Sequence, residues 1–286
     1  MHIIMVLFVH NSEQLQGLDA DHVEHIIFEA EYHDPIFPKS IPNYVTTIEY
    51  YGQTELEISA EILPSNLVKL VVLKYSGTLN GDNIPHSLEY FHIEQGSFSM
   101  KNMGKTNIRY FRMGDYDKPI VTGDLPNNLR ILDLGGNFNK LISSNALPLG
   151  LSAIYFSPNF NKLIFQNTFP ESVELIHFGH SFNRRIGKNI LPSNLKFLKM
   201  GRSCDNIYPD IIESAPNLEY IYLNNCTYFR NLGKLNKITP VIVSNEHGIE
   251  TEQSDYYVPD NSADTKNFAN IFYPPLGCHQ MGIVPK

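Results

Sequence analysis

The chain has 286 residues, of which 42% are hydrophobic and 18% are charged, and its formal net charge is −8. This acidic balance argues against a nucleic-acid-binding protein, because such proteins present a basic face to the phosphates. No segment approaches the roughly 18 apolar residues of a membrane span, so we expect no membrane association. Three cysteines are too few for a disulfide framework and favour a reducing, cytoplasmic setting.

A repeat of about 22 residues starts at the N-terminus and continues to about residue 245. Its most regular position, here termed the anchor, is an apolar residue that usually follows a proline by three places. The ten clear anchors are Val23, Val45, Leu67, Leu88, Ile108, Leu129, Leu151, Val173, Leu195 and Leu218. Met1 and Ile238 keep the frame as partial repeats at the two ends. Self-similarity at so short a period predicts a solenoid, in which each coil buries its apolar face against its neighbours.

Each coil also carries apolar residues three and five places after its anchor, as in Leu129, Leu132 and Leu134. This alternation predicts a short strand with those side chains turned inward. Every coil returns the chain one strand over, so the strands should be parallel and roughly 4.8 Å apart. Two coils should be irregular, because Lys105 replaces the proline in one and Pro216 is displaced by one place in the other.

Three Phe–Asn pairs lie 22 residues apart, at 138–139, 160–161 and 182–183. We predict that these phenylalanines and Tyr32 stack into a spine that fills the wide side of the coil. Asn137 and Asn159, which precede two of the pairs, should be buried and satisfy backbone groups in the turn. The wall opposite the spine is predicted to consist of Ile36, Ile58, Ile142, Ile164 and Ile186.

The run L-P-x-x-L-x-x-L-x-[LF]-x-x-x-F-N-x-x-I, clearest over residues 126–190, resembles the FNIP-type repeat. That repeat is a branch of the leucine-rich repeats found in social amoebae and in giant viruses of amoebae. The resemblance implies a curved right-handed leucine-rich-repeat solenoid with a parallel β-sheet on the concave face and mostly irregular convex segments. It also implies a protein-interaction module, located in the host cytoplasm if the protein is viral. Relatives often carry an F-box, which makes a substrate-recruiting subunit of a ubiquitin ligase the alternative function.

The repeat domain is predicted to span residues 1–245, and residues 246–286 to form an acidic linker and a C-terminal cap. Six acidic residues against two lysines give this second segment a net charge of −4. Its first part, to about residue 264, has the composition of a solvated linker. Residues 265–286 are much more apolar, and we expect them to cover the last coil near Leu218 and Ile221.

No catalytic motif emerges from the sequence, so we predict a protein that is not an enzyme and holds neither cofactor nor metal. The pairs His22–His25 and His177–His180 have metal-ligand spacing but lack a third ligand nearby. A carbohydrate-active β-helix is a third possibility, since such enzymes also stack short coils. It would need clustered acids on one strand face, whereas Glu49, Glu94 and Asp133 fall in different coils.

The strand face that points away from the core is the predicted site of function. Residues two and four places after each anchor should form two columns on this face. Aromatic residues, histidine and arginine recur there, as they do at the centres of protein interfaces. The predicted partner-binding residues are Tyr90, His92, Tyr110, Arg112, Asp133, Tyr155, His177, Phe197, Lys199, Tyr220 and Tyr222. We therefore expect a monomeric scaffold for another protein, with Arg112 and Asp133 close enough to pair.

Overall fold

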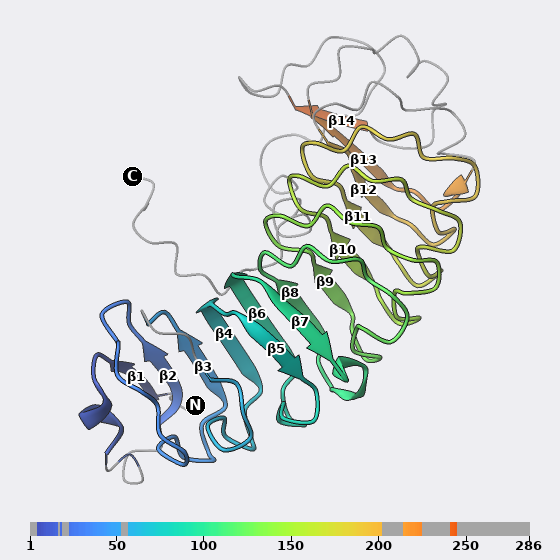
Figure 1. Cartoon of the computed structure of the whole chain (residues 1–286). Coiled ribbons are helices and arrows are strands. Elements are labelled where there is room, and N and C mark those ends of the chain that lie inside the picture. The colour runs from blue at the N-terminus through green and yellow to red at the C-terminus, as the bar shows by residue number, and fades with distance from the viewer. Residues whose placement is uncertain are drawn as a thin grey trace.

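A computed structural model describes residues 5–16, 18, 23–52, 57–201, 214–224 and 241–244. Twelve parallel strands form one continuous curved sheet, and the rest of each coil lies on its outer side (Figure 1). The strands, in order along the sheet, are β1 (Met5–Val9), β2 (Val23–Phe28), β3 (Thr47–Tyr50), β4 (Lys69–Lys74), β6 (Tyr90–Gln95), β8 (Tyr110–Met113), β9 (Ile131–Asp133), β10 (Ala153–Tyr155), β11 (Leu175–His177), β12 (Phe197–Lys199), β13 (Tyr220–Asn224) and β14 (Val241–Ser244). The predicted solenoid and its parallel sheet are confirmed.

The anchors occupy the core in the predicted register. All ten are buried, from Val23 in the second coil to Leu218 near the end of the described chain. Where the structure describes their side chains, the partners three and five places further are buried as well, including Leu132, Ile154 and Ile176. One apolar cluster runs the length of the array, because each coil packs its inward side chains on the coils before and after it.

The predicted aromatic spine is present. Phe138, Phe160 and Phe182 are fully buried, and the ring of Phe160 stacks at 5.9 Å from each of the other two. Phe178 stacks on Phe182 at 3.9 Å, so rings from the strand ends add to the spine. The isoleucine wall is buried at Ile142, Ile164 and Ile186, whereas Ile36 and Ile58 are only partly buried against the core.

The prediction that Asn137 and Asn159 are buried is wrong. Both side chains are exposed, and they bond to each other along the surface, with Asn159 Nδ2 donating to Asn137 Oδ1 at 3.1 Å. The asparagines of the first two Phe–Asn pairs bond to the backbone instead. Asn139 Oδ1 accepts from the amide of Asn161 at 3.0 Å, and Asn161 Oδ1 accepts from the amide of Asn183 at 3.1 Å. The asparagine that follows the buried phenylalanine thus links one turn to the next.

A second asparagine position, absent from the sequence predictions, also recurs every 22 residues. Asn145, Asn167 and Asn189 have φ angles of 59°, 61° and 59°, in the left-handed region. Asparagine tolerates this conformation better than other non-glycine residues, because its short polar side chain can bond locally. Each lies three residues before the proline of the following coil, so it turns the chain back toward the next strand.

Two features depart from the regular coil. β5 (Gly77–Asn80) and β7 (Phe98–Lys101) pair in a small parallel sheet of their own, which the sequence analysis did not predict. The coil in which Lys105 replaces proline contains a 3₁₀ helix, η3 (Met103–Lys105), so its predicted irregularity is confirmed. A further 3₁₀ helix, η1 (Ser12–Leu15), follows β1 and is capped by Asn11. Several predictions lie outside the described residues. They concern the cap at 265–286, the part of the coil at 202–213 that precedes Pro216, and all three cysteines.

Candidate functional site

The two predicted columns form on the face of the sheet that points away from the core. Tyr90 pairs with Tyr110 across β6 and β8, and the same column continues through Phe197 and Tyr220. The second column is made of His92, Arg112, Asp133, Tyr155, His177, Lys199 and Tyr222, each in register with the next. The main chain therefore aligns all the predicted partner-binding residues, although the side chain of Tyr222 lies outside the described part.

Near the N-terminal end of the face, several side chains contact the buried carboxylate of Glu49. Lys69 Nζ donates to Glu49 Oε1 at 2.8 Å, and Tyr51 Oη donates to Glu49 Oε2 at 3.0 Å. His25 Nε2 lies 3.6 Å from the same carboxylate. Burial alone would raise the pKa of Glu49, but pairing with His25 and Lys69 outweighs it and lowers the pKa to about 2. Glu49 is therefore a permanently charged centre at neutral pH.

A second charged network lies in the middle of the face, on β6, β8 and β9. Arg112 donates to Asp133 at 2.7 Å and to Glu94 at 3.3 Å, while His92 Nε2 lies 2.7 Å from the other oxygen of Glu94. The predicted pairing of Arg112 with Asp133 is confirmed. The hydrogen bond from His92, followed by the charge of Arg112, lowers the pKa of Glu94 against the effect of burial. The predicted partner-binding residues did not include Glu94. It lies two residues after His92, however, and therefore on the same face of the sheet.

A pair of tyrosine rings adjoins this network. Tyr90 and Tyr110 stack in parallel at 4.2 Å, and Lys69 Nζ lies 5.5 Å above the Tyr90 ring. Tyr110 is almost wholly buried, and burial raises the pKa of its hydroxyl. The neighbouring carboxylate of Asp133 and the hydroxyl of Tyr90 raise this pKa further.

Toward the C-terminal end the face becomes apolar. Ala153, Tyr155 and Leu175 form a cluster separate from the main core, with Ile131 and Phe197 packed against it. Phe197 stacks on Tyr220 at 5.4 Å, and Tyr155 meets His177 edge-on at 5.8 Å. The face thus changes character along its length, from paired charges in β3–β9 to aromatic and aliphatic side chains in β10–β13.

The exposure of these residues differs from the sequence expectation. The columns were predicted to stand in solvent, yet His92, Tyr110, Asp133, Tyr155 and Lys199 are all at least nine-tenths buried. Part of the reason is lateral packing, since rows of adjacent parallel strands bring side chains into contact across the face. Sequence patterning identifies which face a side chain occupies, but it does not report how tightly neighbours on that face close over it.

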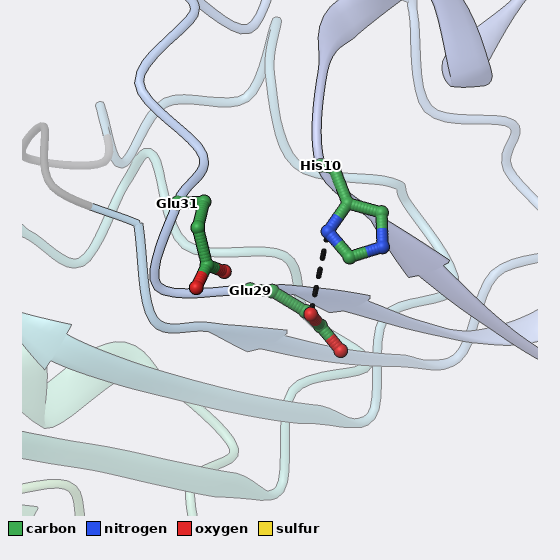
Figure 2. Close-up of side chains that lie close together, drawn as sticks. All are labelled: His10, Glu29 and Glu31. Carbon is green, nitrogen blue, oxygen red and sulfur yellow. Dashed lines mark ion pairs between the residues drawn. The ribbon is translucent and has the colours of Figure 1, made fainter.

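A third cluster lies at the N-terminal end of the array. His10, Glu29 and Glu31 place ligand atoms within 4.8 Å of one another, and His10 Nδ1 lies 3.3 Å from Glu29 (Figure 2). The pairing of Val9 with Phe28 sets the next residues, His10 and Glu29, side by side. The sequence analysis did not predict this trio, because His10 and the two glutamates lie in different coils. All three side chains are at least partly exposed, and the carboxylates are ordinary surface groups for an acidic protein.

One protein family matches part of the repeat array. The FNIP Repeat family matches residues 116–159 and 160–203. No curated protein matches the chain. A solved structure, described as CroV588, a novel circular LRR protein, is 20% identical over 78% of this chain, with a TM-score of 0.49. The match covers 40% of that protein, so this chain spans less than half of its length. Among the described residues, no helix is long and apolar enough to cross a membrane. The chain is therefore a repeat protein that carries FNIP repeats, a type of leucine-rich repeat, in residues 116–203.

Proposed function

We propose that the face formed by the two columns binds another protein and that the chain catalyses no reaction. The observation that carries this proposal is the recurrence of aromatic, arginine and histidine side chains on β6, β8, β10, β11 and β12, held in register by the sheet. Such side chains supply most of the energy at the centres of protein interfaces. A rigid sheet also presents them at little entropic cost, because they are packed before a partner arrives.

The test is partner capture with a double variant. Tyr110→Ser with Tyr155→Ser removes two aromatic anchors from the middle of the face, each expected to contribute about 2 kcal/mol or more. Binding to the partner, first identified by affinity purification from the native cell, should weaken roughly a hundredfold or more. Both tyrosines lie outside the main core cluster but are buried on the outer face, so circular dichroism of the double variant must first show that the repeat is folded.

Two controls separate binding from packing. Tyr110→Phe with Tyr155→Phe keeps both rings and should bind far better than the serine pair. Leu149→Ser changes an exposed apolar side chain outside the columns and should leave affinity unchanged. Normal binding by the serine pair would place the interface elsewhere on the molecule. Recovery of cullin-type adaptors in the same purification would favour the ubiquitin-ligase alternative.

A further inference from the structure

A file of basic residues runs across four consecutive coils, on the stretch that leads from the aromatic spine to the isoleucine wall. One cation stands two places before the buried isoleucine of each coil. These four residues, here termed the basic strip, are Lys118, Lys140, Lys162 and Arg184. Together with their flanks, residues 117–121, 139–143, 161–165 and 183–187 contain five cationic side chains and one acidic side chain. The strip is therefore strongly positive in a chain whose net charge is −8.

Bonds between coils hold the basic strip in register. Ile120 forms a parallel bridge with Ile142, and the amide of Asn139 donates to Asp117 Oδ1 at 2.7 Å. The equivalent bond recurs between the three Phe–Asn pairs. The rings of those pairs, each two places before a cation, are 5.9 Å apart from one coil to the next. The cations therefore recur along the array at about the same interval.

Much of this positive charge is not balanced within the described part of the chain. Lys140 pairs with Asp117 at 2.9 Å, and Arg184 donates to the carbonyl oxygen of Asn161. Neither Lys118 nor Lys162 forms an ion pair with a described residue, and no side chain of the strip is buried. Like charges at this spacing repel one another, so a ligand that carries negative charge along the strip would relieve the repulsion.

Exposed apolar side chains accompany the basic strip. Leu141 and Leu163 directly follow two of its lysines and are 45% and 53% exposed. Val121 and Phe165 each follow an isoleucine of the wall and are 48% and 46% exposed. Single exposed apolar residues are ordinary on a protein surface, but these four lie in three consecutive coils beside the same cations. Such a gathering marks a surface that contacts a partner.

We propose that the basic strip and its apolar neighbours bind an extended acidic segment of another protein. An extended chain places side chains of one face about 6.8 Å apart, at every second residue. This distance is close to the 5.9 Å interval between coils, so alternate acidic residues can face successive cations. The strip is one cation wide and follows a line, which suits a linear chain and not the plane of an anionic bilayer. This surface is separate from the two columns, so the proposal goes beyond the proposed function.

Fluorescence anisotropy of a labelled synthetic peptide tests this proposal on the full chain. The probe has glutamate at every second position, with leucine and phenylalanine between, and a matched peptide has glutamine in place of glutamate. At low salt the glutamate peptide should bind and the glutamine peptide should not. Raising the salt to about 1 M should abolish binding, because charges are then screened within roughly 3 Å. Failure of the glutamate peptide to bind, or binding that salt does not weaken, would overturn the proposal.

Matched variants locate the binding surface. Lys118→Gln with Lys162→Gln breaks no described ion pair and should weaken peptide binding about fivefold to tenfold, with an unchanged circular dichroism spectrum. Lys74→Gln with Lys101→Gln removes two exposed lysines outside the strip and should leave the affinity unchanged. Equal losses in the two pairs would show attraction to charge in general and refute the strip as the site.

Two further measurements test the apolar contact and the class of partner. Leu163→Ser with Phe165→Ser keeps every cation and should weaken peptide binding at least threefold; unchanged binding would refute the apolar part of the site. Vesicles that contain phosphatidylserine should not sediment the protein. Sedimentation that Lys118→Gln with Lys162→Gln abolishes would assign the strip to a membrane and overturn the proposal. None of these variants alters the two columns, so their failure leaves the proposed function to be decided by the tyrosine variants.

Discussion

Single side chains in this repeat act on three coils at once, and Phe160 is the clearest example. Its ring is fully buried, 5.9 Å from Phe138 on one side and from Phe182 on the other, and 4.4 Å from Phe156 in its own coil. Phe160→Ala should lower the free energy of unfolding by about 3–5 kcal/mol, because the lost ring leaves a cavity between coils. Urea denaturation followed by circular dichroism measures this loss. An unchanged transition would mean that the spine contributes little to stability.

Glu49 gives a residue-scale prediction for pH. Its folded pKa of about 2 lies below the ordinary value of 4.5, so the carboxylate contributes stability that is fully present above pH 4.5. That contribution is lost as the pH falls toward 2, by at most about 1.4 kcal/mol per pH unit. Glu49→Gln should therefore be less stable than the wild type at pH 6, and the difference should shrink by pH 3. Chemical denaturation at both pH values checks this, and a constant difference would contradict it.

At the scale of the element, the short strands depend on close approach between coils. β9 is followed by Gly135, which has φ of 69° and whose hypothetical Cβ would lie 1.7 Å from the carbonyl oxygen of Gly114 in the preceding coil. A backbone atom cannot move away from such a contact without shifting the strand. The glycine thus sets the spacing at which β8 and β9 can pair while Arg112 reaches Asp133.

We expect Gly135→Ala to destabilise the protein by about 3 kcal/mol or more, since it combines a backbone clash with a left-handed conformation. Gly123→Ala is the matched control, because that glycine also has a positive φ, of 94°, but nothing lies within 4 Å of its hypothetical Cβ. Thermal melting of both variants separates the two effects. Equal shifts in melting temperature would show that conformation, and not the approach of the neighbouring coil, determines the cost.

At the scale of the whole molecule, the array is a one-dimensional stack. Each strand of the main sheet pairs only with the strands beside it, from β1 to β14. The stability of such a stack is close to a sum of coil and interface terms, so a local defect need not unfold distant coils.

Phe160→Ala should consequently increase local unfolding in the central coils more than in the N-terminal coils. Hydrogen exchange measured by mass spectrometry should show faster amide exchange in β9–β12 than in the wild type, with β2–β6 little changed. The difference would follow the distance of each strand from the missing ring. Exchange that rises equally along the chain would indicate a single cooperative unit and contradict this view of the array.

The sequence alone determined the repeat and its register. A 22-residue period combined with period-two alternation leaves one arrangement that buries every anchor, and all ten anchors are buried. The aromatic spine followed for the same reason, since a large ring at a fixed place in each coil can only stack on its copies. The pairing of Arg112 with Asp133 followed from strand adjacency.

Only the tertiary structure decided how the side chains close over the outer face and how the turns are satisfied. Asn137 and Asn139 are two residues apart and chemically identical, yet the fold exposes the first and uses the second to bond the next coil. The separate sheet of β5 and β7 and the meeting of His10 with Glu29 likewise depend on contacts between coils. A repeat pattern fixes which residues are equivalent, because burial repeats with the period. It does not fix turn hydrogen bonds or side-chain cover, because those depend on the three-dimensional path of each coil and on what lies above the sheet.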